Sequence, residues 1–428
     1  MNKLAAKVVS VIGGTMVYLR HGATADAAPV FGQDPVIPAA KKQGIPTLKM
    51  PTARGWAEGE VPVAAPGLKV NAFAKNLRHP RWMHVLDNGD VLVAEAASEA
   101  GGIRNIYDYA MQVTMRRAGA LEESANRISL LRDGNGDGVA DERHDYIEGL
   151  NQPFGMLRLG DTFYVVNTDG LVAFDFVEGA TRLQGPGRPI VEFKPAGHWT
   201  RSIIPNADGT KLYIGVGSLS NIADQGFEVE EGRACIWEVD VATGAARIFA
   251  GGLRNPVGMA WGPKGDLWTV VNERDGLGDE TPPDYLTSVK EGGFYGWPYA
   301  YWGIVDDRVP QDAAKVAQTI KPDFALGGHT ASLGLCWIDE GVLPGFGAGM
   351  VIGQHGSWNR SKLSGYKVIH VPFKDGKPVG PQRDILTGFL SDDEKFSRGR
   401  PVGVTLAADG ALLVADDVGH CIWRVTGA

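Results

Sequence analysis

Arginines, histidines and side-chain amides recur along this chain just before, or at the start of, short apolar runs. They are Arg81, Gln152, His198 with Arg201, Arg254 with Asn255, His329 with Thr330, and Arg398 with Arg400. A guanidinium group binds a carboxylate through two parallel hydrogen bonds, and an imidazole can exchange a proton near pH 7. If the fold brings these positions together, they could bind a planar ligand that carries several carboxylates.

A structural explanation stands beside this functional one. An arginine or histidine at the end of a strand can simply pair with a carboxylate of a neighbouring sheet, and for any single residue this is as plausible as a role in binding. A full set of such pairs would need matching acids in the same segments, and Glu273 is the only clear one. The convergence of the whole set therefore favours a ligand site.

The apolar runs belong to one pattern that occurs six times. Each copy reads as two short strands rich in Val, Ile, Leu and aromatic residues, joined by a turn that contains Gly or Asp-Gly. The copies start at Leu77, Leu150, His198, Leu253, His329 and Gly399. Further strand candidates, such as RISLLRD and HCIWRV, lie between them. We therefore predict an all-β fold, a six-bladed β-propeller of four-stranded antiparallel blades with long loop insertions.

The chain divides into three parts. Residues 1–27 read as a signal peptide, with early lysines, an apolar run and small residues up to Ala27, which predicts export to the periplasm. A disordered extension is the alternative. Residues 28–66 are rich in Pro and Ala and are expected to form an N-terminal arm that is ordered by contact. Residues 67–428 form the predicted propeller domain.

Some segments should decorate or close the propeller. The segment 68–76 could add a strand to the sixth blade and so lock the ring. Insertions are expected at residues 98–126, 275–291 and 302–328, of which the first should be helical.

Composition limits the possible partners. The formal net charge is −8 and the chain has no run of Lys and Arg, which argues against a nucleic-acid partner. After the N-terminus no apolar run is long enough to span a membrane. Cys235, Cys336 and Cys421 each lie in an apolar, strand-like run and are expected to be buried. The sequence has neither a haem-attachment motif nor a GxGxxG motif between a strand and a helix, so neither haem nor NAD is predicted.

From about Leu68 to Arg424 the chain resembles the soluble sugar dehydrogenases that depend on pyrroloquinoline quinone (PQQ), the glucose/sorbosone dehydrogenase family. The segments that carry the resemblance are GLRNPVGMAWGPKGDLWTVVNE, GGFYGWPYAYWG and HWTRS. HGSWNRS and HTASLGL are more similar to the sorbosone dehydrogenase branch than to soluble glucose dehydrogenase.

This resemblance implies roles for the residues introduced above. His198 matches the general base that takes the proton from the anomeric hydroxyl of the sugar while hydride passes to PQQ. Arg254 matches the arginine over the reacting quinone oxygens, where it stabilises developing charge. The remaining positions are assigned to cofactor binding, and they are Gln152, Arg201, Asn255, Thr330, Arg398 and Arg400.

The resemblance also implies calcium. The segment NERDGLGDE matches the loop whose main-chain carbonyls ligate the Ca²⁺ that bridges to PQQ, and Arg274, Asp275 and Gly276 are the candidate ligands. The loop departs from the glucose-dehydrogenase form by about one residue and has Arg274 where that form has Gln. A lysine of that form near the fifth blade is also missing, and HGSWNRS offers His355, Asn359 or Arg360 in its neighbourhood.

A second calcium candidate is the segment DGNGDGVADE. Its oxygen-bearing side chains alternate around Gly138 as in calcium loops, and they are those of Asp133, Asn135, Asp137 and Asp141. The twelfth position is His144 and not Glu, so the segment is no EF-hand. An Asp/Gly-rich hairpin turn is the alternative, and a metal here would have a structural role.

The predicted function is PQQ- and Ca²⁺-dependent oxidation of an aldose or an aldosone such as sorbosone. Electrons would pass to an external acceptor, a cytochrome or a quinone-type molecule. One alternative is a calcium-dependent lactonase on a six-bladed propeller, because fold does not fix function. The other is a propeller that binds a ligand without catalysis. A lactonase would need carboxylates and amides around a metal in the channel, where this chain supplies Arg and His.

Overall fold

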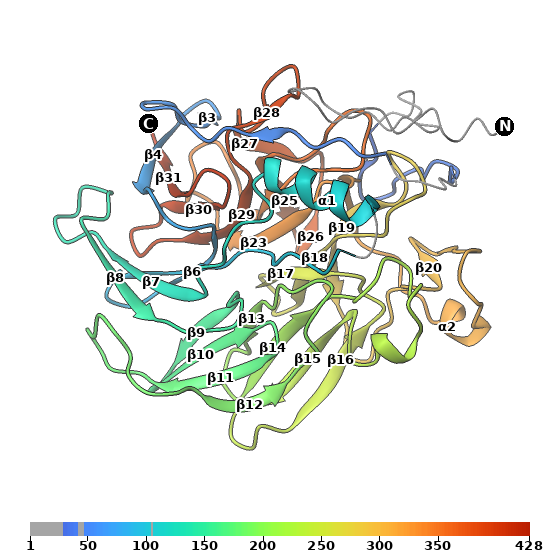
Figure 1. The fold of residues 1–428 in the computed structure, drawn as a ribbon, viewed down its shortest axis with the longest axis horizontal. Helices are drawn as coiled ribbons and strands as arrows, with labels where there is room; N and C mark the ends of the chain where they lie inside the picture. Colours follow the sequence, from blue (N-terminus) through green and yellow to red (C-terminus); the bar gives the residue numbers. More distant parts are fainter. Residues whose placement is uncertain (1–28, 42–46, 104–105) are drawn as a thin grey trace.

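The protein is described here by a computed structural model that covers residues 29–41, 47–103 and 106–428. The signal peptide predicted for residues 1–27 lies outside the described residues. Six antiparallel sheets surround a central axis (Figure 1), which confirms the predicted all-β propeller. No helix among the described residues has the length and apolar character to cross a membrane.

The first three blades each contain four strands. Blade 1 contains β5 (Pro80–Val85), β6 (Val91–Glu95), β7 (Arg127–Arg132) and β8 (Glu142–Ile147). Blade 2 contains β9 (Met156–Leu159), β10 (Thr162–Asn167), β11 (Gly170–Asp175) and β12 (Arg188–Glu192). Blade 3 contains β13 (Ile203–Pro205), β14 (Lys211–Val216), β15 (Cys235–Asp240) and β16 (Ala246–Gly251).

Two of the other three blades are wider than the predicted four strands. Blade 4 contains β17 (Pro256–Trp261), β18 (Leu267–Val271), β19 (Pro283–Val289) and β22 (Phe324–Gly328), with β1 (Phe31–Gly32) at its edge. Blade 5 contains β23 (Ser332–Ile338), β24 (Gly349–Gln354), β25 (Lys367–Lys374) and β27 (Arg383–Thr387), extended by β3 (Val63–Ala64) and by β26 (Lys377–Pro378), which pairs with β25. Blade 6 contains β29 (Pro401–Leu406), β30 (Leu412–Asp416), β31 (Cys421–Gly427) and β4 (Leu68–Ala74).

The ring closes as predicted, through the strand that precedes the first copy of the repeat. β4 pairs antiparallel with β31, from Leu68 opposite Gly427 to Ala74 opposite Ile422. The first strand of each blade contacts the first strands of both neighbouring blades, and β29 contacts β5. The first and last strands of the propeller are therefore joined in one sheet, and the ring has no break between blades 6 and 1.

The described parts of the segment 29–66 contact the propeller. β1 and β3 add to blades 4 and 5, and β2 (Thr52–Ala53) pairs in parallel with β28 (Phe396–Ser397). The main-chain N–H of Lys41 donates to Leu277 (2.8 Å), and that of Lys49 donates to Trp358 (2.8 Å). The arm thus rests on the two loops that contain Asp275 and Asn359.

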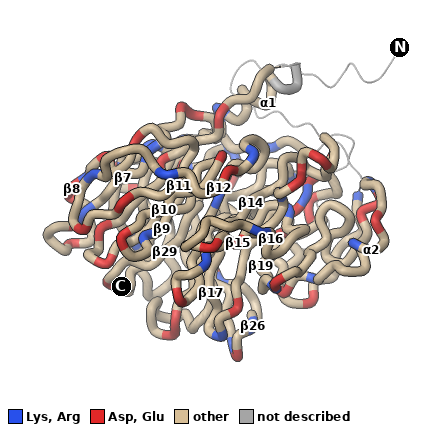
Figure 2. The backbone as a smooth tube through the Cα atoms, turned by 90° about the horizontal axis from the view of Figure 1, so that it is seen from below, with Lys and Arg blue, Asp and Glu red and all other residues tan. Residues whose placement is uncertain are grey.

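The insertions agree only in part with the prediction. α1 (Ile106–Arg117) confirms a helix within 98–126 and stands above the body of the propeller (Figure 2). The insertions predicted at 275–291 and 302–328 were wrong in extent, because they contain β19 and β22, two strands of blade 4. Both strands are almost entirely buried and lack the polar–apolar alternation that marks a half-exposed strand.

The actual insertion of blade 4 lies between β19 and β22. It contains the β20–β21 pair (Ala300–Tyr301 and Ile304–Val305) and α2 (Ala313–Ala317). α2 begins where the Asp312 side chain accepts hydrogen bonds from two main-chain N–H groups. A short 3₁₀ turn, Glu228–Glu230, lies in blade 3.

Apolar side chains beside the innermost strands join the blades. One buried cluster joins residues at or beside the innermost strands of five blades, and it includes Trp82, Met156, Val257, Leu333 and Val402. Burial of each such side chain stabilises the fold by roughly 1.5–3 kcal/mol. The blades therefore share one apolar core next to the propeller axis.

Lys and Arg positions are interspersed with Asp and Glu positions along the chain (Figure 2). None of the three cysteines forms a disulfide; Cys235 and Cys421 are buried as predicted, whereas Cys336 is partly exposed.

Candidate active site at the mouth of the propeller axis

The innermost strands of neighbouring blades pack closely against one another. The residues that precede these strands in the sequence therefore lie near each other. A Cβ atom on Gly334 of β23 would lie 2.1 Å from the carbonyl oxygen of Val402 in β29. A Cβ atom on Gly403 would lie 2.7 Å from the carbonyl oxygen of Arg81, at the start of blade 1. Only glycine permits these contacts. Gly334 and Gly403 of the repeat are thus required for close packing of the inner strands. This close packing brings the strand starts near one another at the mouth of the axis.

His198 lies at this mouth, in the segment before β13, with one ring nitrogen available. Its Nδ1 donates a hydrogen bond to the carbonyl oxygen of Ser218 (2.8 Å), so the neutral ring carries its proton there and leaves Nε2 as an acceptor. Burial and the nearby positive charge of Arg254 lower the pKa of His198 to about 3. The imidazole is therefore neutral at physiological pH, as a general base must be.

Gly217 makes room for His198 and Asn255 to lie side by side. A Cβ atom on Gly217 would lie 2.2 Å from Asn255 Oδ1 and 2.6 Å from His198 Cβ. Asn255 Nδ2 donates to Asn272 Oδ1 (3.3 Å), while its own Oδ1 is buried without a partner. An unpaired buried acceptor of this kind costs free energy unless a ligand supplies the missing donor.

Arg254 is held by oxygen atoms on several sides. Its Nη1 donates to the carbonyl of Glu273 (2.8 Å) and its Nη2 donates to Asn221 Oδ1 (3.0 Å). Nη2 also lies 3.4 Å from Asp275 Oδ2. Arg254 as a whole residue is only 6% exposed. Because its guanidinium is both buried and hydrogen-bonded, its position is fixed before any ligand binds. This fixed positive charge suits a site where negative charge develops.

Asp275 connects Arg254 to blade 5. Its Oδ1 lies 3.3 Å from His329 Nδ1 and accepts a hydrogen bond from Asn359 Nδ2. Burial alone would raise the pKa of Asp275, but the hydrogen bond with His329 and the charge of Arg254 outweigh it and lower the pKa to about 2. His329 Nε2 donates to the carbonyl of Gly278 (2.9 Å), and the contact with Asp275 raises the pKa of His329 despite burial.

A second buried carboxylate, Asp417 of blade 6, accepts hydrogen bonds from side chains of blades 1 and 5. Arg81 Nη1 and His355 Nε2 (2.8 Å) both donate to its Oδ2. Arg400 donates to the carbonyls of His355 (2.9 Å) and Gly356 (2.7 Å), and its guanidinium pairs with no carboxylate in the described part of the chain. The Arg81 guanidinium also lies over the Trp199 ring, 5.3 Å from its centroid.

The structure brings together only some of the predicted cofactor-binding residues. His198, Arg254 and Asn255 are adjacent. The hydroxyl of Thr330 donates to Asp284 (3.1 Å), which also accepts a hydrogen bond from the main-chain N–H of Glu273, the residue whose carbonyl binds Arg254. Gln152 donates to the carbonyl of Ala97 (2.9 Å) on the side of blade 1.

Arg201 and Arg398 do not lie at the mouth with the others. Arg201 is fully buried and donates to the carbonyls of His198 and Thr200 (3.0 Å), so it supports the segment that carries the base. Arg398 Nη1 donates to the carbonyl of Gly388 (3.2 Å), and its Nε lies 3.8 Å from Glu60 of the arm.

Neither predicted calcium loop gathers a set of acidic ligands. Among the described residues, no group of three or more His, Cys, Asp or Glu side chains is placed to hold a metal ion. The loop 133–141 joins β7 to β8 as a hairpin, and Asp133 accepts hydrogen bonds from the main-chain N–H groups of Gly136 (2.8 Å) and Gly138 (2.8 Å). Calcium binding by Asp133, Asn135, Asp137 and Asp141 stays a prediction.

Sequence reasoning missed the acids Asp275 and Asp417 as partners of the mouth cations. Each follows the second strand of its blade: Asp275 comes after Arg274 in TVVNERD, beyond the end of β18 at Val271, and Asp417 directly follows the end of β30 at Asp416. Their position after equivalent strands was the available signal, because the ends of equivalent strands meet at the same face of a propeller.

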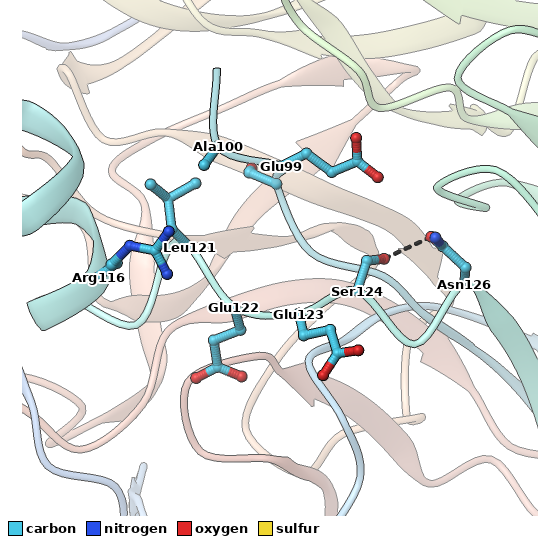
Figure 3. A pocket seen from close by; sticks show the side chains of 9 residues that line it. Glu99, Ala100, Arg116, Leu121, Glu122, Glu123, Ser124 and Asn126 are labelled. Atoms are coloured by element: carbon cyan, nitrogen blue, oxygen red, sulfur yellow. Dashed lines mark hydrogen bonds between the residues drawn. The ribbon is translucent and has the colours of Figure 1, made fainter. Parts of the chain in front are cut away.

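A polar cavity of about 450 Å³ lies beside the mouth, between α1 and the segment 121–126 (Figure 3). It is lined by Ser98, Glu99, Ala100, Arg116, Leu121, Glu122, Glu123, Ser124 and Asn126. Two hydrogen bonds link this lining to the site: Trp199 Nε1 donates to Ser98 Oγ (2.9 Å), and the main-chain N–H of Gln152 donates to Asn126 Oδ1 (3.0 Å). The cavity and the mouth therefore share one wall.

A family model described as TrAA12-like matches residues 62–301 and 300–428. The chain belongs to the TrAA12-like family. The fold of this TrAA12-like protein is similar to that of a Trichoderma reesei enzyme of carbohydrate-active enzyme family AA12. That match has a TM-score of 0.69 and 22% sequence identity, and it covers 86% of this chain and 98% of the other.

Curated relatives match about half of this TrAA12-like chain. An uncharacterised protein of Borreliella burgdorferi is 30% identical over 238 residues, which are 53% of this chain and 60% of the relative. The pyrroloquinoline quinone-dependent pyranose dehydrogenase of Coprinopsis cinerea is 26% identical over 289 residues, which are 51% of this chain and 38% of that enzyme. The chain thus spans less than two thirds of the length of each.

Proposed function

We propose that this protein is a PQQ-dependent dehydrogenase that oxidises an aldose or an aldosone such as sorbosone, and that it passes the electrons to a separate acceptor. The observation that carries the proposal is the pair formed by His198 and Arg254 at a mouth rich in fixed cations. A neutral imidazole with a free Nε2 lies within the electrostatic influence of a buried guanidinium. The name of the Coprinopsis cinerea relative supports the same chemistry.

The residues at the mouth fit a planar quinone with several carboxylates. Arg254 and Arg400 present fixed positive charge, and Arg400 donates only to main-chain carbonyls through its side chain. Asn255 Oδ1 and Arg81 Nε are buried polar atoms without a partner among the described residues. Because buried polar atoms are normally paired, these two atoms support a polar ligand at this place.

Each residue has a distinct task in the proposed reaction. PQQ, when bound, would supply the two-electron oxidant. His198 Nε2 would accept the proton of the anomeric hydroxyl, and Arg254 would stabilise the negative charge that builds up on the oxidant. Ser218 keeps the His198 proton on Nδ1, and the polar cavity at the shared wall would admit a hydrophilic substrate. An aldose would leave as its lactone.

We further propose that the protein acts in the periplasm, on the basis of the export signal read in residues 1–27. Its electron acceptor would be a cytochrome or a quinone-type molecule, since the sequence contains no haem-attachment motif.

The test is reconstitution of the purified protein with PQQ. We expect reduction of an artificial electron-accepting dye that requires both PQQ and a sugar from a panel of aldoses and sorbosone. A parallel assay follows hydrolysis of sugar lactones without PQQ. Lactone hydrolysis without any sugar-dependent dye reduction would replace the proposed function by that of a lactonase. Failure of both assays with saturating PQQ would favour a binding protein.

A further inference from the structure

We propose that the loop 272–276 takes no calcium ion and that arginine side chains supply the positive charge at this place. The proposal rests on the proposed function, because it concerns how the same mouth would meet PQQ. The resemblance assigned Ca²⁺ to main-chain carbonyls of Arg274, Asp275 and Gly276. In the structure, carbonyl oxygens of this loop accept hydrogen bonds from guanidinium groups instead.

Three arginines from different parts of the chain share these carbonyl oxygens. Arg254 donates to the carbonyls of Asn272 (3.3 Å) and Glu273 (2.8 Å). Arg274 donates to the carbonyl of Asp275 through Nη2 (2.7 Å) and Nε (3.1 Å). Arg308, from the insertion of blade 4, donates to the carbonyl of Gly276 (3.3 Å).

The Asp275 carbonyl has no room for a metal. A Ca²⁺ ion lies about 2.3–2.6 Å from each oxygen ligand, and it needs six to eight of them. Arg274 Nη2 lies 2.7 Å from this oxygen, and Asn221 Nδ2 donates to it as well (3.1 Å). A cation and a guanidinium nitrogen cannot both occupy that position.

Arg274 cannot readily move aside. Its side chain is 1% exposed and pairs with the Asp306 carboxylate, which is 2% exposed. If the guanidinium left, Asp306 would remain as a buried charge without its partner, which is strongly unfavourable. The pair therefore fixes Arg274 on the loop.

The Asp275 carboxylate is also engaged, because it faces Arg254, His329 and Asn359. Glu273 Oε2 accepts a hydrogen bond from the main-chain N–H of Arg274 (3.0 Å), whereas Glu273 Oε1 is buried without a partner among the described residues. A Ca²⁺ ion entering this loop would thus meet three guanidinium groups, with Glu273 Oε1 as the unpaired carboxyl oxygen of the loop. The carboxylates of a bound quinone would instead meet N–H donors.

The test is a calcium titration of the full-length apoprotein by isothermal titration calorimetry. It uses a variant with Asp133→Ala and Asp137→Ala, which removes the other candidate calcium loop. We expect no binding of Ca²⁺ at millimolar concentration. The same variant, titrated with PQQ in EDTA and in CaCl₂, should give dissociation constants that agree within about twofold. Calcium binding with one ion per chain, or PQQ binding tightened tenfold or more by Ca²⁺, would overturn the proposal.

Arg274→Gln tests the cause in the same background. Loss of the guanidinium frees the Asp275 carbonyl and the Asp306 carboxylate, so we expect this variant to gain calcium binding and a rise in Tm on calcium addition. Arg360→Gln is the matched control, because Arg360 is also a buried arginine, 8% exposed, whose carboxylate partner, Glu280, lies in the neighbouring loop. It should gain neither.

The outcomes separate this inference from the proposed function. A folded Arg274→Gln variant that takes no calcium would show that Arg274 is not what excludes the ion, and the proposal would fail. If Arg274→Gln does not fold, the calcium titration of the parent variant decides. If PQQ binds in neither buffer, the proposed function fails, while the calcium titration still decides the state of the loop.

Discussion

At the scale of single residues, the reactive group of the site is held in one protonation state by its surroundings. Ser218 fixes the proton of His198 on Nδ1, and Arg254 with burial keeps the second nitrogen unprotonated. The acids Asp275 and Asp417 each contact more than one side chain. At Asp417 the cation is Arg81, because burial and the charge of Arg400 lower the pKa of His355 to about 3. The mouth thus keeps its charged groups rigid rather than solvated, which is what electrostatic preorganisation requires.

Replacement of His198 should remove catalysis and leave the cofactor in place. We expect His198→Ala to lower kcat by about 10²–10⁴-fold, the usual contribution of a general base. The measurement is steady-state dye reduction with saturating PQQ. His144→Ala is the control, since His144 lies on β8 at the surface and pairs with Glu142. A His198→Ala variant with full activity would refute the assigned role of this residue.

The pH dependence should also differ from that of an ordinary histidine base. Because the pKa of His198 is lowered to about 3, the imidazole stays neutral as the pH falls from 8 to 5. An unperturbed histidine would lose its basic form below a pKa of about 6.5. We therefore expect log kcat/KM to show no acid limb between pH 5 and 8. A tenfold fall between pH 6.5 and 5.5, absent from control variants, would contradict the lowered pKa.

At the scale of strands and loops, much of the molecule could be predicted from the sequence. The six copies of the hairpin pattern predicted the six blades, and the apolar segment before the first copy predicted the closing strand β4. The buried strands β19 and β22 escaped prediction because neither shows polar–apolar alternation. The edge strands β1 and β3 have only two residues each, so local sequence carries almost no signal for them.

The candidate site, like the strands, could be predicted only in part from the sequence. His198, Arg254 and Asn255 follow from the repeat and the resemblance, whereas the inward orientation of Arg201 and the engagement of Arg398 with the arm depend on contacts far apart in the chain.

The closing strand should contribute strongly to stability. Phe73 in β4 is 5% exposed and belongs to a cluster that joins strands of blades 6 and 1. We expect Phe73→Ala to lower the free energy of unfolding by about 3–5 kcal/mol, because it removes a large buried side chain and leaves a cavity. Urea unfolding followed by tryptophan fluorescence measures this change. Phe396→Ala, at a side chain that is 42% exposed, should cost much less, and equal losses would contradict the closing role of β4.

At the scale of the whole molecule, the fold gathers buried arginines of an acidic chain at one place. The chain carries a formal net charge of −8, and Lys and Arg positions are interspersed with Asp and Glu positions along it (Figure 2). The ring brings the starts of its innermost strands to one mouth, where arginines and histidines gather around the propeller axis. Closure of the ring by β4 and β31 therefore matters for function as well as stability, because Arg81 of blade 1 and Asp417 of blade 6 meet only when the ring is closed.

The central claim is that this mouth binds PQQ, and an equilibrium titration of the apoprotein with PQQ tests it most directly. Isothermal titration calorimetry should give one PQQ per chain. Arg400→Ala should weaken binding at least tenfold, since it removes a cation that has no carboxylate partner in the described part of the chain, and His198→Ala should leave the affinity within about threefold. Absence of binding, or binding that Arg400→Ala does not change, would contradict the account.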